Sequence, residues 1–197
     1  MSYQGNTEIP VWKRVLFSQT LVEKNKSHRI AYIAVMTALI VVANMFFEFK
    51  LAETQFSFTL VISALTGIMI GPLCGAAACF LGDLVGFLYN SGGYAYLPWI
   101  GISMALVAVV AGLVYALPWR WEGHLFVKGG IVSVVTFLLC TVGINTTAFW
   151  LLYSKVSYGT YLISRLFVQG QIWNSLVNYA LLFIVVPVLQ RVKLVSV

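Results

Sequence analysis

The most constraining feature of this sequence is a series of long apolar runs with almost no charged residues. Of the 197 residues, 60% are hydrophobic and only 9% are charged, whereas soluble domains carry about 25% charged residues. Five charge-free runs cover residues 30–47, 56–70, 97–117, 129–154 and 166–190, and a sixth, 73–89, is interrupted only by Asp83. Because about 20 apolar residues span a bilayer as a helix, the sequence predicts an all-α integral membrane protein with six transmembrane helices.

The runs leave room for one membrane domain and two short flanking segments. We expect a basic N-terminal segment at residues 1–29, the membrane domain at 30–190 and a C-terminal tail at 191–197. The first apolar run has no recognisable cleavage site, so it is expected to be a retained helix. Gly71 and Pro72 divide an apolar stretch that otherwise extends from 56 to 89, and proline disfavours a continuous helix. A tight turn is therefore expected between the second and third helices.

The distribution of Lys and Arg predicts the orientation, since cytoplasmic loops are enriched in these residues. With the N-terminus inside, nine basic residues fall on the cytoplasmic side, and only Lys50, Lys155 and Arg165 fall outside. Both termini are therefore expected in the cytoplasm of a multi-pass cell-membrane protein, with outer loops at 48–55, 90–96 and 155–165. The basic residues do not form a patch interleaved with aromatic residues, so nucleic acid is not an expected partner.

The sequence contains no motif of an ATPase or a hydrolytic enzyme. It lacks a phosphate loop ending in Gly-Lys-Ser/Thr, a His-Glu-x-x-His pair and a Gly-x-Ser-x-Gly turn. Cys74, Cys79 and Cys140 lie in apolar runs without CxxC spacing, and neither His28 nor His124 has a spaced second ligand. We therefore expect no catalytic residues, no metal and no cofactor in this chain.

Asp83 is the one acid inside a predicted span. An intramembrane carboxylate is a candidate for function, because burying it without a partner is strongly unfavourable. Asp83 lies between Gly82 and Gly86, which allow close backbone approach. Substrate binding, proton relay and a structural hydrogen bond between helices are all open to it. The lack of other ionisable residues in the spans favours the structural role.

Polar and aromatic side chains gather toward the outer ends of several spans. Arg165 could clamp a carboxylate with two parallel hydrogen bonds, or it could extend to lipid headgroups. Asn145 could bind a ligand or another helix, and the aromatic residues could bind a ligand or anchor the helices at the interface. Gln169 is expected one turn after Arg165 on the same helix. The expected ligand contacts are Gln55, Asn90, Tyr94, Trp99, Asn145, Trp150, Arg165 and Gln169.

Small residues recur at every fourth position, which places them on one helix face and lets a second helix approach closely. Most of them are expected to pack inside the protein. The pair on the first helix differs, because that helix could present a face to a partner. These positions are Ala34, Ala38, Gly67, Gly71, Gly75, Gly82 and Gly86.

The motifs of the central block occur in the order found in one known family. They are a Gly-x-x-x-Gly-Pro turn at 67–72, a Gly-Asp-x-x-Gly helix at 82–86 and a Gly-Gly-Tyr loop at 92–94, followed by Ile144-Asn145-Thr146 and the segment 161–165. On these motifs, residues 30–190 resemble the folate-type group of S-components, the substrate-binding subunits of energy-coupling factor (ECF) transporters.

The resemblance implies a six-helix S-component bundle that binds one vitamin near its outer face. It also implies docking on a transmembrane coupling protein and two ATPase subunits, which would hold ATP and Mg²⁺. In such families a small-residue pair on the first helix contacts the coupling protein, and Ala34 and Ala38 match that pair. The first outer loop acts as a lid, which here would be about residues 51–55.

The sequence departs from the folate-type pattern just before the second helix, where Glu53-Thr54-Gln55 replaces an expected arginine. Folate carries two carboxylates, whereas Arg165 is the one plausible fixed cation. A ligand with one carboxylate and hydroxyl or amide groups fits better, so the predicted vitamin is pantothenate. Folate or another water-soluble vitamin is the alternative. A proton-coupled secondary transporter or a membrane enzyme is an alternative of another class, although the clustered ionisable residues and inverted repeat typical of these are not seen.

Overall fold

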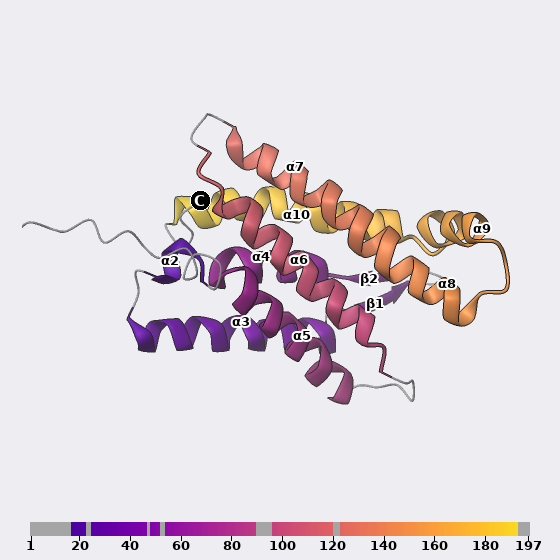
Figure 1. The fold of residues 1–197 in the computed structure, drawn as a ribbon, viewed down its shortest axis with the longest axis horizontal. Coiled ribbons are helices and arrows are strands. Elements are labelled where there is room, and N and C mark those ends of the chain that lie inside the picture. The colour runs from indigo at the N-terminus through magenta and orange to yellow at the C-terminus, as the bar shows by residue number, and fades with distance from the viewer. Residues whose placement is uncertain are drawn as a thin grey trace, which may run out of the picture.

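The structure, a computed structural model, describes residues 17–22, 25–46, 48–51, 54–89, 96–119 and 123–192. Its long helices form one elongated bundle, with a small hairpin at one end (Figure 1). The elements are α2 (Gln19–Val22), α3 (Lys26–Phe46), β1 (Glu48–Leu51), β2 (Thr54–Ser57), α4 (Thr59–Ile70), α5 (Pro72–Tyr89), α6 (Pro98–Ala116), α7 (His124–Thr136), η1 (Phe137–Thr146), α8 (Thr147–Tyr153), α9 (Tyr158–Ile163), η2 (Ser164–Val168) and α10 (Gln171–Arg191).

Within the described ranges, five helices are long and apolar enough to cross a bilayer. They are α3, α5, α6, α10 and a continuous 30-residue helix, His124–Tyr153, composed of α7, η1 and α8. The sixth apolar helix, α4, has only 12 residues, or about 18 Å at 1.5 Å per residue. The prediction of an all-α membrane bundle with six apolar helices is confirmed, with differences at two of the predicted spans.

The first difference lies in the second predicted span, 56–70. Its first residues belong to β2, which pairs antiparallel with β1, so that Lys50 lies opposite Gln55 and Phe49 opposite Phe56. Helix α4 begins only at Thr59. Alternation of apolar and polar residues at Phe56, Ser57 and Phe58 favours a strand rather than a helix here. The expected outer loop 48–55 is thus largely a hairpin.

The second difference lies in the last predicted span, 166–190. Gly170 has a φ of 67° and interrupts the helix, because a glycine adopts this left-handed conformation without a steric penalty. Helix α10 begins at Gln171, and the residues before the break form the separate short helix of α9 and η2. The prediction that Arg165 and Gln169 share the transmembrane helix is therefore wrong.

Helix α4 lies at the centre and packs against α3, α5, α6 and α10. A side chain at Gly67 would overlap the backbone carbonyl of Ala108 in α6, and one at Gly75 would lie 2.8 Å from the Cα of Gly67. The expectation that these glycines pack inside the protein is confirmed. Gly71 follows α4 with a φ of 108°, and Pro72 begins α5, which confirms the predicted turn.

Residues 17–22 pack on this turn rather than extending away from the bundle. The Ser18 hydroxyl donates to the carbonyl of Met69, and its backbone N–H donates to the carbonyl of Ile70 at 3.3 Å. Leu21 is buried beside Ile70. Part of the predicted N-terminal segment therefore covers the C-terminal end of α4 (Figure 1).

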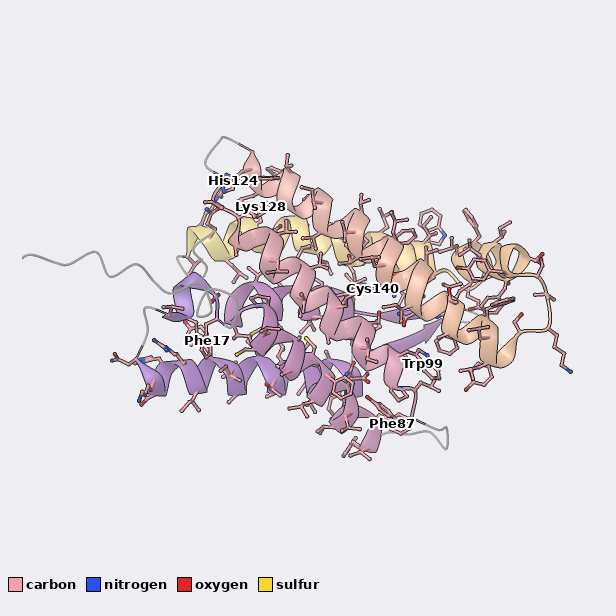
Figure 2. All side chains as sticks on the ribbon, viewed as in Figure 1. Phe17, Phe87, Trp99, His124, Lys128 and Cys140 are labelled. Carbon is pink, nitrogen blue, oxygen red and sulfur yellow. The ribbon has the colours of Figure 1, made fainter. Side chains whose placement is uncertain are left out.

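The same end of the bundle contains a fully buried lysine. Lys128 of α7 donates from Nζ to the carbonyl of Tyr115 at 3.0 Å and to that of Leu117 at 2.7 Å. These carbonyls stand at the C-terminal end of α6, where the last helical C=O groups have no partner within the helix. Figure 2 places Lys128 and His124 together there. The lysine thus acts as a cap supplied by a neighbouring helix.

At the opposite end, two asparagines of α10 hold the junction of β2 and α4. Asn178 is fully buried, accepts from the N–H of Val61 at 3.0 Å and donates to the carbonyl of Ser57 at 2.7 Å. Asn174 accepts from the N–H of Ser57 at 3.1 Å. The first turn of α4 has no side-chain cap of its own from Phe58. The N–H of Val61 in that turn is therefore satisfied from across the bundle.

We predict that Asn178→Ala lowers the free energy of unfolding by about 2 kcal/mol or more, because it leaves buried backbone groups of Ser57 and Val61 without partners. Thermal unfolding of the purified protein in detergent measures the change. Ser133→Ala is the matched control, since the Ser133 hydroxyl bonds only to Gly129 within its own helix. Equal stability of the two variants would contradict the interhelical role of Asn178.

Candidate functional site

The site is built at the hairpin end, where α6 packs against η1 and where Arg165 of η2 reaches the ring of Phe149 in α8. Ser103 of α6 accepts a hydrogen bond at 3.1 Å from Nδ2 of Asn145, in η1. The Oδ1 atom of Asn145 is buried and has no partner among the described residues. An amide that is half satisfied in this way retains an acceptor for a hydroxyl or N–H donor.

The π-helical geometry of η1 determines where Asn145 lies. Thr146 donates from Oγ1 to the carbonyl of Thr141, five residues back, at 2.7 Å. A wider helical turn of this kind is frequent at functional sites, because it rotates the following side chains relative to an ordinary α-helix. The sequence does not distinguish this π-helical segment, since the apolar run 129–154 fits an unbroken α-helix.

Trp99 lies one turn before Ser103 on α6, so both face the same side of the helix. Its indole Nε1 is buried and lacks a hydrogen-bond acceptor in the part of the chain that the structure describes. Figure 2 places the side chain at the end of α6 that is distant from Lys128. Trp99 and Asn145 therefore provide an unused donor and an unused acceptor from two adjacent elements.

Arg165 approaches the same face of η1 and α8 from the short helix beyond the chain turn. Its guanidinium carbon lies 4.3 Å from the ring centroid of Phe149, which follows Asn145 by one turn. Its Nη1 atom donates to the hydroxyl of Tyr161 at 3.4 Å. Nε is buried and has no acceptor within the described ranges. The ring and the phenol hold the cation in place while leaving it N–H groups for an anion.

Trp150 has a different role from its neighbours. Its indole N–H donates to the carbonyl of Val156 at 2.8 Å, and its ring meets Tyr158 edge to face at 5.4 Å. Tyr158 in turn donates to the carbonyl of Val142 at 3.2 Å. These contacts fold α9 back onto η1 and α8. The indole N–H of Trp150 is therefore occupied, and the face of its ring is what it can offer to a ligand.

The structure says less about the other four residues that were predicted to contact the ligand. Gln169 is half-buried and stands beside the break at Gly170 rather than one helical turn above Arg165. Gln55 lies in β2 opposite Lys50, but its side chain is outside the described set. Asn90 and Tyr94 also lie outside the described residues. Ligand contact by these four residues stays a prediction.

Asp83 is 9% exposed and accepts a hydrogen bond at 3.0 Å from the hydroxyl of Tyr96. Burial raises the pKa of the Tyr96 phenol to about 12, and the charge of Asp83 and the hydrogen bond to it add to the rise. The phenol therefore stays protonated and donating at physiological pH. This contact favours the structural role over the proton relay considered for Asp83.

Three residues of the site were not anticipated from the sequence. They are Ser103, Phe149 and Tyr161, which contact Asn145 or Arg165. Ser103 is four residues after Trp99, Phe149 four after Asn145 and Tyr161 four before Arg165, so helical spacing from the predicted residues could have found all three. Among the described residues, no three His, Cys, Asp or Glu side chains are grouped as a metal site would require.

Comparison with known proteins identifies the family and the fold of the chain. The family described as ECF transporter, substrate-specific component, matches residues 28–190. A crystal structure of FolT bound with folic acid superposes with a TM-score of 0.61 at 20% sequence identity, over 79% of this chain and 87% of the FolT chain. This similarity concerns the fold. No curated protein sequence matched.

Proposed function

The chain belongs to the family of ECF transporter substrate-specific components, and from this premise we propose that it captures pantothenate at the outer face of the membrane. Members of this family bind a substrate for transport and are not enzymes. The membership also removes the two alternatives of another class, a membrane enzyme and a proton-coupled secondary transporter. What remains to be proposed is the vitamin, the orientation and the partners.

The observation that carries the choice of vitamin is how Arg165 is held: among the side chains that the structure describes at the hairpin end, it is the one cation with fixed partners. In the described part of that end, Arg165 is held by Phe149 and Tyr161, whereas Lys155 lies exposed on the turn before α9. One fixed guanidinium matches one carboxylate. Folate presents two carboxylates, and pantothenate presents one.

The unused polar atoms around Arg165 support the same choice. Oδ1 of Asn145 requires a donor, and Nε1 of Trp99 requires an acceptor. Pantothenate carries hydroxyl groups and an amide, which supply both. Folate is the second candidate because of the likeness to FolT, and its pterin would need donors and acceptors at this depth as well. Mass spectrometry of the vitamin that copurifies with the protein distinguishes the two.

If Arg165 binds the carboxylate in a partly dry site, Arg165→Ala should lower affinity for pantothenate by a factor of about 30 to several thousand, equivalent to about 2 to 5 kcal/mol. Arg165→Lys should recover only part of this, because an ammonium cannot form the two parallel bonds. Isothermal calorimetry on the purified subunit, with pantothenate and folate as ligands, gives the affinities.

Two further variants test whether the loss of affinity is specific to the guanidinium of Arg165 and its packing. Lys155→Ala removes an exposed cation at the same end and should leave the affinity unchanged. Phe149→Leu removes the ring beneath the guanidinium and should weaken binding about 2- to 30-fold. Unchanged affinity in Arg165→Ala would exclude Arg165 from the pocket, and tight folate binding without pantothenate binding would refute the choice of vitamin.

The proposed partners are a transmembrane coupling protein and two ATPase subunits, which would bind ATP and Mg²⁺. Support comes from α3, where Ala34 and Ala38 are exposed one turn apart beside Val35 and Leu39, which are 64% and 38% exposed. Such a face admits close approach by a second helix. None of the residues on this face of α3 belongs to the proposed ligand site around Arg165.

Replacement of both Ala34 and Ala38 with Trp should abolish ATP-driven vitamin uptake, because the bulky rings prevent close helix approach. Binding by the isolated subunit should be retained. Uptake into proteoliposomes that contain the full complex, together with calorimetry on the subunit alone, measures both. Loss of binding in a correctly folded double variant would contradict a docking role.

We also propose that both termini face the cytoplasm, with residues 1–29 and 191–197 flanking the membrane domain 30–190. The described basic residues support this orientation, since Lys26, Arg29, Lys128 and Arg191 lie near the ends of α3, α7 and α10 on the side of the bundle away from the hairpin (Figure 1).

In a protein without its three native cysteines, a cysteine placed at Ser91 should react with an impermeant maleimide added to intact cells. One placed at Ser196 should react only after the membrane is permeabilised. The reverse pattern would invert the topology and move the proposed vitamin site to the cytoplasmic face.

A further inference from the structure

Tyr96 is inserted between α5 and α6 just before α6 begins. Its hydroxyl donates to Oδ2 of Asp83 at 3.0 Å, and its ring lies 5.1 Å from that of Phe87, one turn further along α5. The side chain therefore lies along the α5 face for a full helical turn. Figure 2 shows Phe87 and Trp99 at this same end of the bundle.

The hydrogen bond is enclosed by a close approach of α6. A methyl group added to Gly101 would lie 2.9 Å from Oδ2 of Asp83 and 3.0 Å from the Tyr96 hydroxyl. Glycine at this position is what lets α6 reach the Asp83–Tyr96 pair. Three elements, α5, the residues entering α6 and α6 itself, thus meet at one buried carboxylate.

Among the described residues, no other side chain anchors the start of α6 in this way. Its N-cap is Leu97, which provides no side-chain hydrogen bond, and its first residue is Pro98, which has no N–H. Trp99 is the next residue, and its buried indole N–H lacks an acceptor in the described ranges. The orientation of this indole therefore depends on how the chain enters α6.

We infer that Asp83 is a positioning residue for ligand binding: through Tyr96 it fixes the first turn of α6 and thereby aims the indole N–H of Trp99 at a ligand acceptor. The inference rests on the proposed function for its ligand. It explains why a carboxylate is kept within the membrane at this position. A charged acceptor forms a stronger hydrogen bond than a neutral one, and Asp83 itself is only 9% exposed.

The decisive variant is Tyr96→Phe, which deletes one hydroxyl and preserves the ring against Phe87. Asp83→Asn is the conservative partner, since its amide oxygen can still accept from Tyr96. Tyr179→Phe is the matched control, because Tyr179 is a buried tyrosine whose hydroxyl likewise meets a side chain, that of Thr136 at 2.9 Å. That pair joins α7 and α10 and does not touch Trp99.

Two measurements are made on each variant. Hydrogen–deuterium exchange in the ligand-free protein reports on the first turn of α6, residues 99–102. Calorimetry with pantothenate, and separately with folate, reports on binding. We expect Tyr96→Phe to accelerate exchange in that turn and to lower affinity for the bound vitamin about tenfold. Asp83→Asn should stay within about threefold of the wild type, and Tyr179→Phe should change neither quantity.

The inference is overturned if the folded Tyr96→Phe variant has the wild-type exchange rate in the first turn of α6 and the wild-type affinity for the vitamin. It is also overturned if Tyr179→Phe accelerates exchange in that turn as much as Tyr96→Phe does. The exchange measurement does not depend on which vitamin is bound. If pantothenate does not bind to the protein at all, the choice of vitamin is refuted. If Tyr96→Phe nevertheless exchanges faster in the first turn of α6 and binds folate more weakly, the positioning role is supported.

Discussion

Every polar group that this protein places within the bilayer must find its partner inside the protein, because lipid offers none. The long helices satisfy their own backbones, but the ends of α4 and α6 lie among other helices and cannot rely on water. Asn178 and Asn174 supply the partners at the start of α4, and Lys128 supplies them at the end of α6. These interhelical contacts let a 12-residue helix stand in the centre of the bundle.

Single buried polar atoms without a partner among the described residues occur in α3 and α4, at Nδ2 of Asn44 and Oγ of Ser63, whereas three occur at the hairpin end. Nε1 of Trp99, Oδ1 of Asn145 and Nε of Arg165 are buried without partners among the described residues. Elsewhere the same protein uses an asparagine side chain to full capacity, as at Asn178. A donor, an acceptor and a cation left open on neighbouring elements are what recognition of a small polar molecule requires.

The sequence predicted the helices well, because continuous apolar length is a direct requirement of a bilayer. It failed where the decisive signal was local: alternation over a few residues produced β2, and the conformation of Gly170 separated Arg165 from α10. For the site, an amide or acid within an apolar run singled out Asn145 and Asp83, and a cation at the edge of a run singled out Arg165. Phe149 and Tyr161 could not be singled out by type, since aromatic residues are abundant at the ends of membrane helices.

The break at Gly170 has a consequence for how ligand preference can diverge among related proteins. None of the residues of α9 and η2 is fully buried, whereas α10 has six buried residues that hold it in the bundle. Substitutions around Arg165 therefore disturb folding little, and the spanning helix beyond the glycine need not change with them. A segment of about ten residues that contributes no buried residue, and that lies beside the proposed ligand site, is where a change of ligand preference would least affect the rest of the scaffold.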